Sequence, residues 1–127
     1  MSWRRKLNDA YYYLKCRLWH RYNTVVCKTL PPTWCDRDYL LLFACFQILV
    51  EFVELEQPWQ FNATDEELDK AYVDCPGRGQ EEIKEWAELR ELYRWGKARL
   101  ADKYIDNYEK DNEMLHRLIN VRRHLWT

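Results

Sequence analysis

The chain has 127 residues and a mass of 15.8 kDa, the size of one ordinary domain, so we expect a single domain over residues 1–127. Hydrophobic residues make up 47% and charged residues 32%, a composition that excludes a disordered or low-complexity protein. The net charge of -1 argues against binding to nucleic acid or membranes by charge alone. Three glycines and four prolines favour helices over a turn-rich β fold.

The first predicted helix runs from about residue 3 to residue 22. Six apolar residues recur there in steps of three or four, the spacing of one stripe on an α-helix: Trp3, Leu7, Tyr11, Leu14, Leu18 and Tyr22. We expect this stripe to be buried, so that Leu14→Ala costs roughly 2–5 kcal/mol of stability. An extended connector should follow, because Pro31 and Pro32 forbid a helix there.

The sequence predicts helices in the rest of the chain as well. One should run from about Asp36 or Asp38 to Glu56 at the centre of the fold, because apolar residues cover more than one of its sides. A capping box at Thr64 should open a short helix. Two more helices are expected over about 80–104 and 105–125, the former bent at Gly96 or packed closely there. The predicted fold is therefore all-α: a compact helical bundle of about four longer helices plus one short helix.

Charge is distributed unevenly along the chain. Residues 1–34 carry a net charge of +6, residues 39–93 a net charge of −9 and residues 94–127 a net charge of +3. We expect the basic ends to pack against the acidic middle and neutralise it. The longest apolar run, residues 39–50, is too short to span a bilayer, which needs about 20 apolar residues.

Few residues are arranged for metal binding or catalysis. Cys16, His20, Cys27 and Cys35 could supply four zinc ligands, but structural zinc sites usually have closer cysteine pairs, so we favour reduced, buried thiols. Glu113 and His116 form one half of a di-iron motif whose second half is missing, which leaves a solvated face as the expected role. The sequence contains no catalytic triad motif or phosphate-binding glycine loop, and its three histidines lie near the ends, where burial is difficult. We therefore predict no enzyme, cofactor or metal.

Aromatic residues are the unusual part of the composition, at 16%. Consecutive helical residues point about 100° apart, so neighbouring aromatic residues such as Tyr11, Tyr12 and Tyr13 cannot all face a core. Tyr, Trp and Arg dominate interface hot spots, and they also stack on bases and bind phosphates. The candidate binding residues are Tyr12, Arg17, Trp19, Arg21, Trp95, Arg122, Arg123 and Trp126.

Three stretches carry a family resemblance: Leu30–Asp38, Ala44–Glu54 and Glu113–Thr127. Together they resemble a group of small uncharacterised proteins of tailed bacteriophages, over roughly a third to a half of the chain. The region from Pro58 to Gln80 lies outside the resemblance. The resemblance implies a phage protein made in the cytoplasm of an infected bacterium, and it assigns no functional residue.

The leading functional hypothesis is a non-enzymatic phage accessory protein that acts on the host cell, as an inhibitor of a host defence. Its partner would be a host protein or a nucleotide-type small molecule, held by the Tyr-, Trp- and Arg-rich surfaces, and we expect the protein to form a homo-oligomer. One alternative is a nucleic-acid-binding protein that uses the basic N- and C-terminal helices. Another is a small virion or assembly component.

Overall fold

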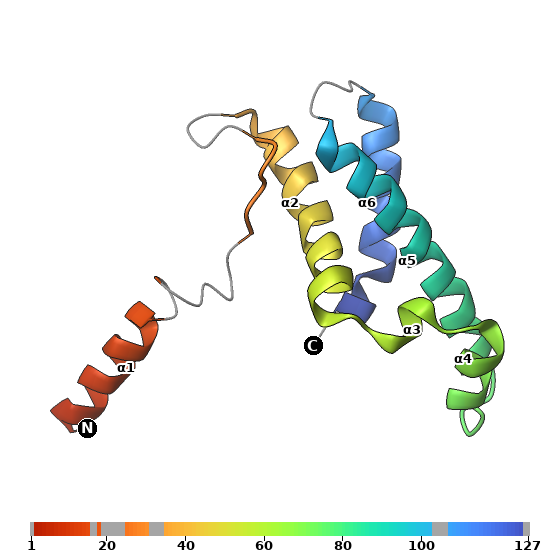
Figure 1. Ribbon diagram of the computed structural model, residues 1–127, viewed down its shortest axis with the longest axis horizontal. Coiled ribbons are helices and arrows are strands. Elements are labelled where there is room, and N and C mark those ends of the chain that lie inside the picture. Colours follow the sequence, from red (N-terminus) through yellow and green to blue (C-terminus); the bar gives the residue numbers. More distant parts are fainter. Residues whose placement is uncertain (1, 16–17, 19–24, 31–34, 103–106, 126–127) are drawn as a thin grey trace.

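The computed structural model describes residues 2–15, 18, 25–30, 35–102 and 107–125, and its regular elements in these ranges are all helical (Figure 1). The all-α class is confirmed, and no helix in these ranges is long and apolar enough to cross a membrane. In chain order the elements are α1 (Trp3–Lys15), α2 (Arg37–Glu51), the π-helix η2 (Phe52–Glu56), α3 (Trp59–Asn62), α4 (Asp65–Ala71), α5 (Arg78–Ala101), α6 (Tyr108–Val121) and the 3-10 helix η3 (Arg122–Leu125).

The helices α2, α5 and α6 form the core. Helix α5 packs against α2, α4 and α6, whereas α2 and α6 touch each other at only a few positions. Phe43 and Phe46 of α2 are fully buried, and the exposed fractions of Leu89 and Leu92 of α5 do not exceed 1%. The expected central position of the second helix is thus shared with α5.

Local sequence signals explain where the middle helices begin and end. The Thr64 hydroxyl accepts the backbone N–H of Glu67, and the Glu67 carboxylate accepts that of Thr64, so the predicted capping box is confirmed. It opens α4, whose Leu68 is fully buried. Helix η2 ends at Gln57 in a left-handed conformation (φ 48°), immediately before Pro58. The single turn of α3 that follows was not predicted.

The glycine in α5 marks a close contact with α2. A Cβ atom at Gly96 would lie 2.5 Å from Cδ1 of Phe46, so this position has room only for hydrogen. The neighbouring Trp95 packs its ring edge-on against Phe46, with ring centroids 4.9 Å apart. The predicted close approach at Gly96 is confirmed.

The prediction for the first helix is wrong in one important respect. No residue of α1 is buried, and the described residues of the stripe are open to solvent: exposed fractions range from 51% at Leu18 to 68% at Trp3. Figure 1 shows α1 apart from the other helices. The periodicity correctly indicated a helix over its described part, but burial also requires a neighbouring surface, and none of the described residues buries the stripe. The stability cost expected for Leu14→Ala therefore does not apply to this arrangement.

The predicted neutralisation of the acidic middle is confirmed for the C-terminal helices. Arg117 of α6 donates to both Glu88 and Glu91 of α5, and Arg123 of η3 donates to Glu85. These contacts tie the chain end to α5 and shape the surface described next.

Candidate binding site

An open pocket of about 640 Å³ lies where the first turns of α5 meet η2, α3 and η3. Its aromatic lining consists of Phe52, Tyr72 and Trp86. Its charged lining consists of Glu56, Arg78, Glu82, Arg123 and His124. The volume falls in the range of small-molecule sites, which is about 300–1,000 Å³.

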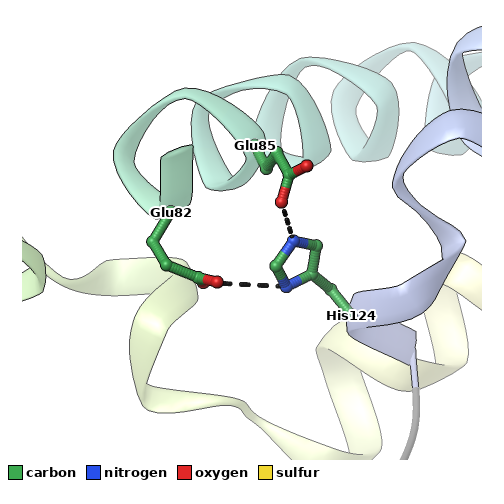
Figure 2. A group of neighbouring side chains, drawn as sticks. All are labelled: Glu82, Glu85 and His124. Carbon is green, nitrogen blue, oxygen red and sulfur yellow. Dashed lines mark hydrogen bonds and ion pairs between the residues drawn. The ribbon is translucent and has the colours of Figure 1, made fainter. Parts of the chain in front are cut away.

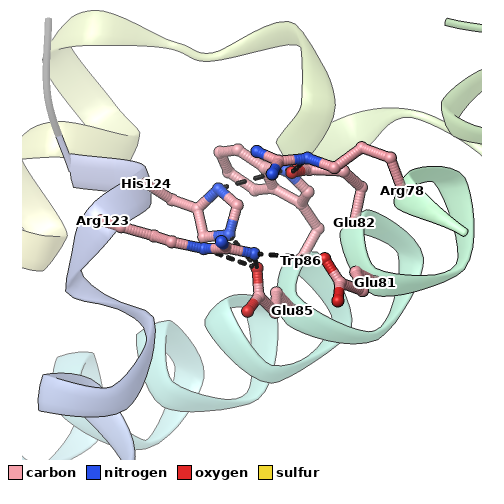
Figure 3. Close-up of polar contacts among 7 residues, drawn as sticks. All are labelled: Arg78, Glu81, Glu82, Glu85, Trp86, Arg123 and His124. Carbon is pink, nitrogen blue, oxygen red and sulfur yellow. Dashed lines mark hydrogen bonds and ion pairs between the residues drawn. The ribbon is translucent and has the colours of Figure 1, made fainter. Parts of the chain in front are cut away.

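The carboxylate of Glu82 organises the floor of the pocket. It is only 2% exposed, and burial of a charge requires partners. The Nε1 of Trp86 donates to it at 2.9 Å and the Nε of Arg78 at 3.1 Å (Figure 3). Because residues four apart share one face of a helix, Arg78, Glu82 and Trp86 line up along α5. Glu82 therefore fixes the positions of one aromatic ring and one guanidinium group.

His124 reaches the same cluster from the end of the chain. Its ring lies between two carboxylates, with Nδ1 at 3.7 Å from Glu82 and Nε2 in contact with Glu85 (Figure 2). The ring also packs against Trp86 at a centroid distance of 5.1 Å, and the side chain is 8% exposed. The expectation that a terminal histidine would be hard to bury is wrong, because η3 turns back over α5.

Arg123 lies beside His124 and shares its carboxylate partner. Its Nε donates to Glu85 at 3.1 Å, and its Nη2 also lies 3.9 Å from Glu81. Burial raises the pKa of Glu85, but the hydrogen bonds from Arg123 and His124 outweigh this effect and hold the pKa below its ordinary value. The same hydrogen bond raises the pKa of Arg123. The guanidinium is thus anchored while 47% of the side chain stays exposed.

Glu82, Glu85 and His124 also have the spacing of a metal-binding trio, with ligand atoms all within 4.8 Å of one another. However, the two carboxylates face different nitrogens of the imidazole ring, whereas a single ion must be reached through one nitrogen. Both carboxylates also accept hydrogen bonds already, from α5 itself and from Arg123. The geometry favours an internal ion-pair network.

The structure describes only two of the four candidate zinc ligands. Cys16 and His20 lie outside the described residues, whereas Cys27 and Cys35 are half-buried free thiols. Burial raises the pKa of Cys27, and the charges of Cys35 and Glu51 raise it further.

The structure brings one of the predicted binding residues to the pocket, namely Arg123. Arg122 is exposed beside it, and Trp95 is half-buried against Phe46 elsewhere on α5. Tyr12 is 67% exposed on α1. The others lie outside the described residues: Arg17, Trp19, Arg21 and Trp126.

Four residues that build the site were not predicted as a group: Arg78, Glu82, Trp86 and His124. The sequence does contain one usable signal, because an arginine, a glutamate and a tryptophan at steps of four can interact along one helix face. His124 is separated from Glu85 by 39 positions in the sequence, and a pattern of neighbouring residues cannot predict a contact over that separation.

The chain was also compared with known proteins. No protein-family model, curated protein or solved structure matches it. The function is therefore inferred from the pocket's own residues.

Proposed function

We propose that the protein is a non-enzymatic binding protein that sequesters a small nucleotide-type ligand in the pocket beside α5. The observation that carries this proposal is a pair of guanidinium groups, Arg78 and Arg123, at an aromatic pocket. Each is held by a glutamate of α5 and each remains partly open to solvent, with side-chain exposures of 43% and 47%.

Such anchored arginines suit a phosphate group. Arg78 uses its Nε for Glu82, which leaves both terminal nitrogens without a protein partner among the described residues. Arg123 donates from Nε and Nη2 to Glu85, which leaves its Nη1 without a hydrogen-bond partner among the described residues. Guanidinium groups bind phosphate oxygens through paired N–H donors, and a fixed guanidinium loses less freedom on binding than a free one.

The aromatic rings suit a base. The guanidinium of Arg78 lies 5.9 Å from the centroid of the Tyr72 ring, so a phosphate held by Arg78 would place the rest of its ligand beside that ring. Trp86 and Phe52 supply further apolar surface to the same pocket. Stacking on aromatic side chains contributes about 1–3 kcal/mol per base.

The contacts of His124 support our proposal of binding without catalysis. It is the histidine that lines the pocket, and both of its ring nitrogens face carboxylates. A general acid or base must reach the group that gains or loses the proton. The resemblance to phage proteins supplies the biological setting that we propose: an accessory protein in the cytoplasm of the infected host that removes a nucleotide-type signal used in defence.

The proposal is tested by calorimetric titration of the purified protein with AMP, ATP, a cyclic mononucleotide, a cyclic dinucleotide and inorganic phosphate. We expect at least one nucleotide to bind in the pocket. Arg123→Gln should weaken that binding about tenfold or more, because a charge-assisted contact is lost. Arg122→Gln is the matched control: it removes the same charge from the neighbouring exposed position outside the pocket lining and should leave affinity within about twofold.

A second experiment identifies the natural partner. Tagged protein is incubated with extract of infected cells, and the bound material is examined for small molecules and for polypeptides. Recovery of a nucleotide that Arg123→Gln fails to retain supports the proposal. Recovery of a polypeptide alone, together with no calorimetric signal for any nucleotide, would overturn it in favour of a host-protein inhibitor.

A further inference from the structure

Helix α2 has a second apolar face that the core does not cover. Leu40, Leu41 and Ile48 are 46%, 61% and 43% exposed, and Ala44 lies between them on the same side. Gln47 and Glu51 lie on the same side of α2 and hydrogen-bond to each other, so this face is mixed. Its exposed leucines and isoleucine nevertheless offer apolar surface to a partner.

The exposed face continues onto α6. Tyr108 and Ile119 of α6 are 62% and 59% exposed, and the half-buried Leu115 lies between them on the same helix face. A small hollow of about 60 Å³ connects the two helices, lined among others by Leu41 and Leu115. The exposed apolar residues of α2 and α6 lie on either side of this hollow, whose lining also includes Asp38, Asp111 and Asn112; we call this surface the α2–α6 groove. It has the position of a missing fourth helix beside α2, α5 and α6.

The same chain carries a helix with the complementary properties. The stripe of α1, which includes Leu7 and Leu14, is uncovered along its whole described length. Basic residues cluster at the N-terminal end of α1, at positions 4–6. Acidic residues lie at the C-terminal end of α2 and in η2, at positions 51 and 56, whereas Glu54 between them is already bonded to Lys97 and Tyr93. Opposite charges meet only if the two helices run antiparallel, which is also the orientation that their dipoles favour.

We propose that α1 of a second copy docks in the α2–α6 groove, antiparallel to α2, and that two copies exchange their α1 helices reciprocally. The exchange is independent of the ligand proposed above. Each copy then completes the other's four-helix arrangement, and the interface is the same on both sides of a twofold axis.

The position of α1 favours a second copy over the chain's own helix. Figure 1 shows α1 apart from α2 and α6, with its apolar stripe exposed, so the chain's own α1 does not fill the α2–α6 groove in this structure. Two reciprocal contacts also double the buried area, toward the roughly 1,600 Å² of stable complexes.

The test uses one variant on each side of the contact. Leu7→Asp places a charge on the α1 stripe, and Ile48→Asp places one in the groove. Asn8→Asp is the matched control, because it adds the same charge to α1 about 100° away from Leu7. Mass in solution is measured by light scattering after size exclusion. We expect the wild type and Asn8→Asp at twice 15.8 kDa, and each of the other two variants at 15.8 kDa.

Mixing the two variants distinguishes exchange of α1 between copies from docking of α1 within its own chain. The Leu7→Asp copy has an unchanged α2–α6 groove, and the Ile48→Asp copy has an unchanged α1. When the two are mixed, the unchanged α1 can dock in the unchanged groove, so we expect a mixed dimer, detected by native mass spectrometry. Thermal melts check folding, and Leu41→Asp replaces Ile48→Asp if the latter unfolds. A monomeric wild type, a dimer that neither variant disrupts, or a mixture that stays monomeric would each overturn the proposal.

Discussion

At the scale of single residues, the pocket depends on two carboxylates that each hold one partly exposed arginine and one more buried ring. Glu82 holds Arg78 and Trp86, and Glu85 holds Arg123 and His124. Removing one member of such a cluster leaves the other polar groups buried without partners, which costs more than the contact itself stabilises. The positions of the two pocket arginines therefore depend on these glutamates.

Glu85 gives a prediction for the dependence of stability on pH. Its pKa in the folded protein lies below the ordinary value of 4.5, so its ionised form is favoured by folding. That contribution is fully present above pH 4.5 and is lost as the pH falls through the lower, folded-state pKa. Glu85→Gln should lower the free energy of unfolding at pH 7 by at most about 1 kcal/mol, because the site is partly solvated.

The measurement is urea unfolding of the wild type and Glu85→Gln at about pH 7, 5, 4 and 3. The two curves of unfolding free energy against pH should converge below pH 4.5, although other carboxylates such as Glu54 and Glu91 keep some slope in both. Curves that stay parallel down to pH 3 would show that Glu85 is not stabilised by its partners.

At the scale of the helices, periodicity and capping signals predicted α1, α2, α4, α5 and α6. The Thr64 box and the position of Gly96 were predicted correctly because both depend on residues a few positions apart or on backbone space. The exposure of the α1 stripe could not be predicted, since an amphipathic pattern shows which face is apolar and not what covers it. The buried pair of Arg99 and Asp111 also has no local signal, because its partners lie on different helices.

Gly96 provides a test of how closely α5 and α2 pack. Alanine in a helix is ordinarily more stable than glycine by roughly 0.5–1 kcal/mol. Here the added methyl group would lie 2.5 Å from the fully buried ring of Phe46, and overpacking typically costs 1–3 kcal/mol. We expect Gly96→Ala to lower the free energy of unfolding by about 1–2 kcal/mol, measured by urea titration.

A second substitution shows whether the clash is the cause. Phe46→Leu shortens the opposing side chain, so the double variant should be more stable than the sum of the two single changes implies. Strict additivity would mean that Gly96 acts through helix flexibility and not through contact with Phe46.

At the scale of the whole molecule, the basic ends of the chain differ in what they contact. The arginines of the C-terminal end are largely engaged, because Arg117 pairs with Glu88 and Glu91, and Arg123 pairs with Glu85. The charges of α1 instead lie on an exposed helix. The +6 and +3 regions of the sequence therefore do not act as one basic face on the described part of the chain.

This distribution gives a prediction for nucleic acid. A protein that neutralises many phosphates loses affinity steeply with salt, by several powers of ten when six to ten contacts are made. Among the described residues, the cations outside the ion pairs lie on α1 and at positions spread along the rest of the chain, such as Lys28, Lys70 and Lys84. Acidic residues surround the paired arginines of α5, α6 and η3. Binding of a labelled DNA or RNA oligonucleotide, followed by fluorescence anisotropy, should be weak at low salt and undetectable at physiological salt. Arg4→Gln combined with Arg5→Gln should weaken the low-salt signal, whereas Arg117→Gln should leave it unchanged. Tight binding that survives physiological salt and depends on Arg117 would instead support a nucleic-acid-binding protein.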